Sequence, residues 1–191
     1  MNKRQMLLRV LTVVAGATCA VPFAAVQAAV QAAIAHPPEL DVALPQHRLL
    51  GKARLSVYGF QVYDSRLWVL PGFNTESFYK QPFALELAYL RDFKNDAIVE
   101  RSLAEMRRVA AIDDAKAIAW TQAMLRVIPN IKKGDRVLGV NRPGEGATFW
   151  VNGKSAGAID DAEFAQLFFG IWLSPKTSQP KMRAALLAGP V

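Results

Sequence analysis

Residues 149–177 read FWVNGKSAGAIDDAEFAQLFFGIWLSPKT, and this stretch contains the most specific local signals in the chain. The dipeptide Asn152-Gly153 strongly favours a two-residue turn between paired strands, so it predicts a β-hairpin over residues 149–159. The acidic pair Asp160-Asp161 places negative charge at the start of a following helix. The apolar residues of that helix recur at the spacing of one helical face: Phe164, Leu167, Phe168, Ile171 and Trp172. Such a stripe usually packs in a core, although it could also line a ligand cleft.

Three more strands are predicted upstream of this stretch, over residues 51–57, 60–69 and 83–90. The first alternates apolar and polar residues with a period of two, which is typical of a strand with two different faces. Gly59 separates the first strand from the second. The third strand places a set of large apolar residues on one face: Phe83, Leu85, Leu87 and Tyr89.

Two helices are predicted between the third strand and the hairpin. Asp92 or Asn95 can cap the first helix, and Asp113 or Asp114 can begin the second, which ends before Pro129. The inward positions of the first helix recur every three to four residues: Ile98, Val99, Ser102, Leu103, Met106 and Val109.

A strand over residues 136–140 and a closing helix over residues 178–187 complete the predicted elements. Residues 36–48 contain three prolines and are expected to form an extended lead-in. Neighbouring strands joined by short turns pair antiparallel. The predicted fold class is therefore α+β, with a large antiparallel sheet covered by a layer of helices.

The first 35 residues have the pattern of a secretory signal peptide. Three basic residues precede an apolar run, and no acidic residue occurs before Glu39. Small residues at two possible sites predict cleavage between residues 28 and 35. The alternative is a retained membrane anchor, which Pro22 and the many alanines of the run disfavour. We therefore expect export to the periplasm, with no stable membrane span after processing, of a mature domain over residues 36–191.

The composition of the mature part argues against several kinds of functional site. Of the 23 basic and 16 acidic residues, three basic ones lie in the predicted signal, which leaves a formal charge of +4. These charges are scattered along the chain, so nucleic-acid binding is not expected. The only cysteine, Cys19, lies in the signal, and the only histidines, His36 and His47, lie in the lead-in. Neither a zinc site nor a histidine-based catalytic triad is expected, and no metal or cofactor is predicted.

Four blocks of sequence carry a family resemblance, and together they cover nearly the whole mature chain. They are Gly51 to Asp64 with Leu67-Trp68, Leu85 to Tyr89, Lys133 to Arg136, and Phe149 to Leu187. These blocks resemble the bacterial chalcone isomerase-like family. The resemblance implies the fold of plant chalcone isomerase, with a ligand cleft between a large sheet and its helices. Relatives with this fold include true isomerases, plastid fatty-acid-binding proteins and non-catalytic helpers, so the fold alone does not assign an activity.

The resemblance also suggests where a catalytic arginine would lie. In the plant enzymes, an arginine on an early strand stabilises the charge that moves from a phenolate to an enolate, because a guanidinium stays protonated and offers several donors. Arg54 is the nearest candidate, with Lys52 and Arg66 as alternatives. The other interpretation of Arg54 is a solvated strand face.

The plant enzymes further use a threonine, a tyrosine and an asparagine. Tyr58 occupies the region of the threonine, and Tyr58, Tyr89 and Asn95 are predicted to bind the ligand. Asn95 equally fits a helix cap. The spacing from Arg54 to Tyr63 differs from the plant pattern, and this departure weighs against isomerase activity.

Three hypotheses about function remain at this point. The first is an exported, non-catalytic protein that binds a small apolar or amphipathic ligand such as a fatty acid. The second is a chalcone isomerase-type intramolecular lyase. The third is a structural partner protein of the cell envelope, whose own partner the sequence does not identify.

Overall fold

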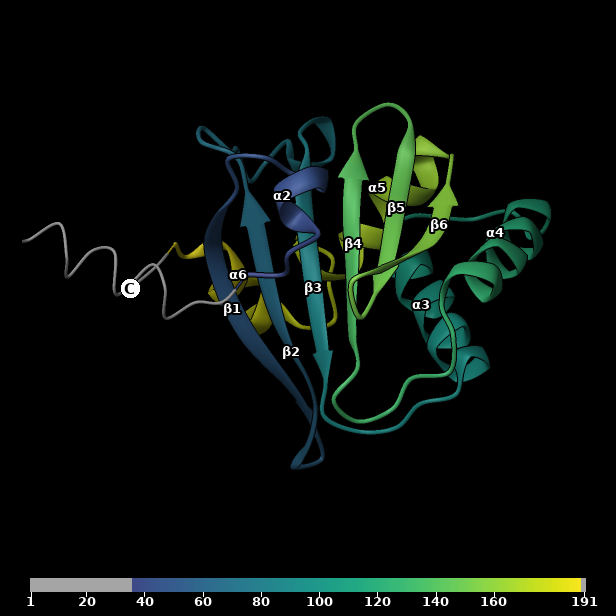
Figure 1. The fold of residues 1–191 in the computed structure, drawn as a ribbon. Helices are drawn as coiled ribbons and strands as arrows, with labels where there is room; N and C mark the ends of the chain where they lie inside the picture. Colours follow the sequence, from purple (N-terminus) through teal and green to yellow (C-terminus); the bar gives the residue numbers. More distant parts are fainter. Residues whose placement is uncertain (1–35, 190–191) are drawn as a thin grey trace, which may run out of the picture. The chain divides into compact units, whose positions relative to one another are not determined.

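The computed structural model describes residues 36–189, and its centre is a six-stranded antiparallel sheet (Figure 1). The strands follow one another across the sheet in the order of the sequence. Their bounds are β1 Arg48–Val57, β2 Phe60–Val69, β3 Phe83–Tyr89, β4 Arg136–Arg142, β5 Gly146–Val151 and β6 Lys154–Ile159. The predicted α+β class and the antiparallel sheet are confirmed. The predicted signal peptide and its cleavage site lie outside the described residues.

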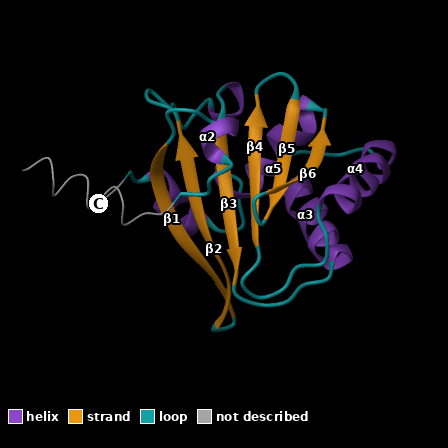
Figure 2. Cartoon of the chain, in the orientation of Figure 1, coloured by secondary structure: helices purple, strands orange, loops and turns teal. Residues whose placement is uncertain are grey.

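Four of the helices lie on one side of the sheet, and a short fifth helix lies on the other side (Figure 2). The four are α3 Asn95–Val109, α4 Asp114–Val127, α5 Ala162–Leu173 and α6 Pro180–Leu187. The short helix is α2 Leu40–Ala43, and a single 3-10 turn, η1, covers Phe78–Lys80. Within residues 36–189, no helix combines the length and the apolar character needed to cross a membrane.

The hairpin predicted at Asn152-Gly153 joins β5 to β6. Both residues adopt positive φ angles, 51° and 81°, which are the left-handed conformations that such a turn requires. The Asn152 side chain also accepts a hydrogen bond from the Arg136 backbone N–H and donates one to Asp135. A second two-residue turn, Tyr58-Gly59, joins β1 to β2, again with positive φ angles, 50° and 80°.

Two of the predicted helix starts are confirmed, and the third differs. Asp113 caps α4 by accepting from the Lys116 N–H at 2.8 Å, and Asp161 caps α5 in the same way. Helix α3 begins after Lys94, which makes no side-chain cap. The expectation that Asp92 or Asn95 caps this helix is wrong. Asp92 accepts from the Lys133 N–H of the neighbouring loop, and Asn95 is the first residue of the helix itself.

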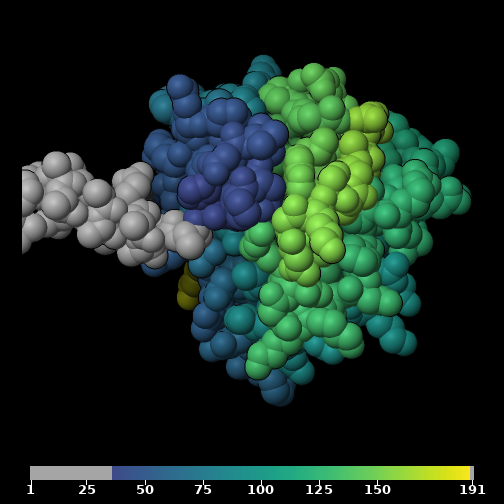
Figure 3. Space-filling view, viewed as in Figure 1, coloured from purple at the N-terminus to yellow at the C-terminus, as the bar shows by residue number. Residues whose placement is uncertain are grey.

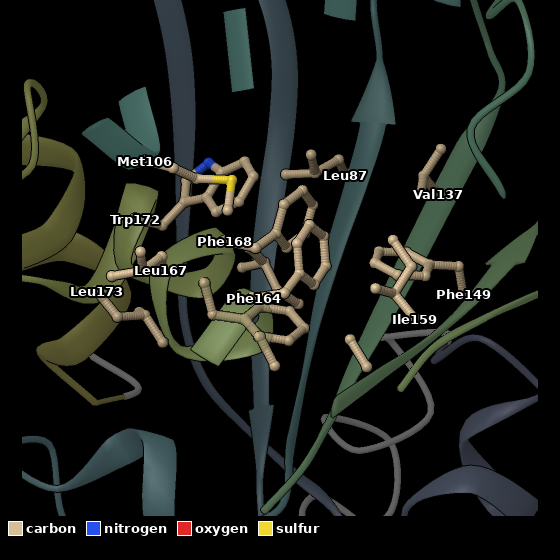
Figure 4. Packing of buried hydrophobic residues seen from close by; sticks show 14 of the residues in the cluster. Leu87, Met106, Val137, Phe149, Ile159, Phe164, Leu167, Phe168, Trp172 and Leu173 are labelled. Carbon is tan, nitrogen blue, oxygen red and sulfur yellow. The ribbon is translucent and has the colours of Figure 1, made fainter. Parts of the chain in front are cut away.

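The main core fills the space between the sheet and the four helices. Its strand residues include the predicted set Phe83, Leu85, Leu87 and Tyr89, all of which are buried on the helix-facing side. Aromatic side chains of α5 project toward the sheet, where Leu87 of β3 and Val137 of β4 lie opposite them (Figure 4). Gly139 of β4 lets the Phe169 ring approach the sheet, since a Cβ at position 139 would lie 3.2 Å from that ring. In the same way, Gly51 of β1 leaves room for the backbone of α6 at Leu186.

The lead-in was expected to be extended, but it contains turns and a four-residue helix, Leu40–Ala43. Helix α2 buries Leu40, and Leu44 follows it, against an apolar patch on the outer face of the sheet. That patch consists of Trp68, Ala84, Leu138 and Val140. Glu39 pairs with Arg136 beside it, with one N–O distance of 3.1 Å. Pro37 and Pro38 precede the helix, and their carbonyls accept hydrogen bonds from the Leu40 and Asp41 N–H groups. Figure 3 shows the lead-in seated on the outer face of the sheet.

Candidate functional site

A cavity of about 620 Å³ lies on the helix-facing side of the sheet, between β1–β3 and helices α3 and α5. Most of its wall is aliphatic or aromatic. The lining residues are Leu55, Val57, Tyr58, Phe60, Val62, Tyr63, Leu87, Tyr89, Arg91, Phe93, Ala97, Ile98, Arg101, Ser102, Glu105, Ile128, Val137, Phe168, Ile171, Trp172, Ser178 and Gln179.

The cavity is where it is because α3 presents small and medium side chains to the sheet at this end. Ile98 and Ser102 lie one turn apart on its inward face, and Ala97 lies beside them. The Ser102 hydroxyl donates to the Ile98 carbonyl at 2.8 Å, so it does not reach across to the strands. Opposite these residues, β1 and β2 extend past the helices toward the Tyr58-Gly59 turn (Figure 1).

Two tyrosines bring phenol groups to the cavity wall. The Trp172 indole N–H donates to the Tyr63 hydroxyl oxygen at 2.9 Å, and the Tyr63 ring packs edge-on against Tyr89. Burial raises the pKa of Tyr63 to about 12, although the hydrogen bond from Trp172 opposes the shift. Burial also raises the pKa of Tyr89 well above its ordinary value. Both phenols therefore stay neutral at physiological pH and can act as hydrogen-bond donors.

Three charged residues line the cavity, and two of them are arginines. Arg101 and Glu105, one turn apart on α3, form an ion pair with an N–O distance of 2.6 Å. Glu105 is buried, whereas the Arg101 side chain is largely exposed. Arg91 lies at the mouth, with its guanidinium 4.8 Å from the centre of the Phe60 ring. The lining supplies one carboxylate and neither histidine nor cysteine, so it does not offer the ligand set of a transition metal.

The structure brings two of the four predicted site residues to this cavity. Tyr89 lies in its wall, and Tyr58 lies at its outer rim, 96 % exposed. Asn95 is not among the described lining residues; its N–H donates to Asn130, and its side chain accepts from the Asp96 N–H.

Arg54, the predicted catalytic residue, faces away from the cavity. It forms a two-pronged ion pair with Asp64 of β2, with N–O distances of 2.5 and 2.8 Å, on the exposed face of the sheet. Asp64 holds the pKa of the Arg54 guanidinium above its ordinary value, and Arg54 lowers the pKa of the Asp64 carboxyl. The geometry matches the solvated-face interpretation, and a catalytic role for Arg54 stays a prediction without a contact to the cavity.

Sequence reasoning missed Tyr63, Arg101 and Glu105 as site residues. A signal for Glu105 was present, because it follows Ile98 and Ser102 at helical spacing and so shares their inward face. Arg101 lies four residues before Glu105, the spacing at which opposite charges pair on a helix.

Comparison with known proteins agrees with this architecture. A model of the chalcone isomerase-like family matches residues 28–188. Among solved structures, a fatty-acid-binding protein from Arabidopsis thaliana superimposes with a TM-score of 0.57 and 14 % sequence identity, over 74 % of this chain and 87 % of its own. At that identity the likeness speaks to the fold alone. No curated protein matches the sequence.

Proposed function

Because the chain belongs to the chalcone isomerase-like family, we propose that it binds a small apolar or amphipathic ligand, such as a fatty acid, without transforming it. The observation that carries this proposal is the cavity itself. Its volume of about 620 Å³ falls within the range of about 300–1,000 Å³ that is common for small-molecule sites. The largely apolar wall suits a hydrocarbon chain or ring system.

The polar groups of the cavity indicate how an amphipathic ligand would be oriented. Arg91 and Arg101 lie toward the mouth, and Arg101 is largely exposed. A carboxylate or another anionic head group placed there would gain charge-assisted hydrogen bonds while remaining partly in water. The apolar part would then lie inward, along Ile98, Leu87 and Phe168. The fatty-acid-binding neighbour supports this choice of ligand class by analogy.

A substitution that fills the cavity tests the proposal. Native mass spectrometry of the purified protein should reveal a co-purifying apolar ligand, and a fluorescent fatty acid should bind to it. Ile98→Trp places a large ring in the cavity and should weaken binding at least about tenfold, a loss of about 1.4 kcal/mol. The matched control is Ile118→Trp, because Ile118 is 61 % exposed on α4 and is not a lining residue. Equal binding by the two variants would contradict the proposal.

Export is the second part of the proposal. The basic start and the small residues near position 28 support secretion to the periplasm. N-terminal sequencing of protein from the cell envelope should give a start between Ala29 and His36. Recovery of the intact chain from the cytoplasm would reject this part.

The isomerase alternative has one observation in its favour, since Tyr63, Tyr89 and Arg101 bring donors to the cavity. Against it, Glu105 pairs with Arg101, and Asn95 lies outside the lining. Removing one preorganised donor from such a site commonly costs a factor of about 100 to 1,000 in rate, so an incomplete set should leave little catalysis. We therefore expect no loss of chalcone absorbance above background. Enantioselective flavanone formation, lost in Arg101→Ala or Arg54→Ala, would establish the enzyme instead.

A further inference from the structure

We propose that the mouth of the cavity docks on an anionic lipid bilayer, with the tip of the β1–β2 hairpin placed among the lipid head groups. An apolar ligand could then pass between the membrane and the cavity without crossing bulk water. This inference rests on the proposed ligand-binding function. It adds that the protein takes its ligand from a lipid bilayer.

The hairpin tip, defined as residues 57–60, concentrates exposed apolar area. Val57, Tyr58 and Phe60 are 41 %, 96 % and 61 % exposed. Among the described residues, the other large apolar side chains with comparable exposure lie apart from the tip, on α2 and α4. All three tip residues also line the cavity, so the exposed patch is continuous with the cavity mouth. Exposed apolar patches beside a binding site commonly mark an interaction surface.

The turn itself gives no reason for an aromatic residue at position 58. Tyr58 adopts a φ of 50°, a left-handed conformation that disfavours bulky side chains and favours Asn, Asp or Gly. The equivalent position of the other two-residue turn, Asn152, carries the residue that this geometry prefers. Tyr58 therefore lowers the stability of the turn, and its phenol ring lies in solvent, where an external partner can bind it.

Charge at the mouth selects an anionic lipid surface over other partners. Arg91 lies over the Phe60 ring, and Arg101, although it pairs with Glu105, exposes most of its side chain at the same opening. The only carboxylate of the lining, Glu105, is buried, and Asp92 of the adjoining loop is paired with Lys132. Tyrosine, phenylalanine and arginine together are the side chains that settle at the boundary between head groups and acyl chains, and the cations are attracted to anionic lipids.

Vesicle binding tests the docking surface. The full chain is compared with Tyr58→Ser/Phe60→Ser by co-sedimentation with phosphatidylcholine vesicles that contain about 30 mol% phosphatidylglycerol. Both proteins carry the same N-terminal segment, so their difference isolates the hairpin tip. We expect at least about tenfold weaker binding by the tip variant. The matched control, Ile118→Ser/Leu125→Ser on α4, should bind like the parent, and urea unfolding of all three proteins checks that each is folded under the assay conditions.

Two further measurements separate this proposal from the function on which it rests. Because Tyr58 and Phe60 also line the cavity, the affinity for the fluorescent fatty acid is measured in vesicle-free solution for both proteins. Transfer of the fatty acid from vesicles should slow in the tip variant by more than any loss of this affinity explains. Fatty-acid binding without any tip-dependent vesicle binding would overturn the docking surface and leave the proposed function standing. Vesicle binding that depends on the tip, without fatty-acid binding, would support docking and reject the proposed ligand. A concentration-dependent dimer that the tip variant loses would overturn docking, because a second copy would then be the partner.

Discussion

The space between the sheet and the helices has two ends that share β3 and α5 but are packed differently. At the filled end, Phe169 of α5 lies 4.8 Å from Phe83 between ring centres, and Gly139 allows the close approach to the sheet. At the hollow end, α3 offers Ile98 and Ser102 to the same strands, and a cavity remains. The difference is one of side-chain volume rather than of topology. A single layer of helices can therefore stabilise the fold at one end and leave a binding site at the other.

The largest expected effect breaks the filled end. Phe169→Ala should lower the free energy of unfolding by about 3–5 kcal/mol, because it empties a closed, nearly fully buried site. Phe93→Ala, at the hollow end, should cost only about 1–2 kcal/mol, because the partly buried ring already borders open space. Urea unfolding of both variants measures the contrast. Equal losses would mean that the two ends are packed alike.

The next effect uses pH to examine the hollow end. The Tyr63 pKa is about 12 in the folded protein, against about 10 in an unfolded chain. Above pH 10 the unfolded state loses its proton first, so stability should fall by up to about 1.4 kcal/mol per pH unit until about pH 12. Below pH 10 this tyrosine makes no pH-dependent difference. Urea unfolding at about pH 9 and pH 11 should show a smaller fall for Tyr63→Phe than for the parent protein; the same fall in both would assign the effect to other groups.

A smaller effect should follow from the hydrogen bond at the boundary between the two ends. Trp172→Phe keeps an aromatic ring against Phe168, but it removes the indole N–H that donates a hydrogen bond to the Tyr63 hydroxyl. The loss of this bond should cost about 1 kcal/mol. It should also raise the pKa of Tyr63 further, because the bond from Trp172 is the main influence that lowers it. Absorbance titration of the tyrosines reports this change, and an unchanged or lower pKa would show that the bond does not form.

The smallest effect concerns the outer face of the sheet, away from both ends. Arg54→Ala removes an exposed ion pair with Asp64, and such pairs contribute little because water screens them. We expect no resolvable change in the urea midpoint and none in fatty-acid binding. A clear loss of ligand affinity in this variant would mean that Arg54 reaches the ligand after all.

Local signals in the sequence were sufficient for most of the sheet and helices, but not for the candidate site. The Asn152-Gly153 turn and the caps at Asp113 and Asp161 are decided by neighbouring residues, and each was predictable. Helix α2 spans only four residues and forms because Leu40 finds an apolar patch made by distant strands, which no local pattern reveals.

The cavity was not predictable for a different reason. A cavity forms where the side chains of the sheet and those of the helices do not fill the space between the two layers. Which side chains face one another there depends on the strand register and the helix positions, and a linear sequence does not show these. The partner of Arg54 illustrates the difficulty. Simple pairing outward from the Tyr58-Gly59 turn would set Arg54 opposite Tyr63, but a register shift in the hairpin sets it opposite Asp64. The same shift places Tyr63 opposite Leu55, and both of these residues line the cavity.

The close fit of α6 on Gly51 has a consequence for the order in which the protein can fold. The sheet is built of strands that follow one another in the sequence, so most of its pairings can form while the contacts are still local. The contact between Gly51 and Leu186 is the opposite case, because it joins the first strand to the last helix. Closing so long a loop is entropically costly and slow compared with forming a hairpin. A growing chain would therefore hold its sheet half covered until its final residues emerge, and the last helix to be made would complete the burial of the first strand.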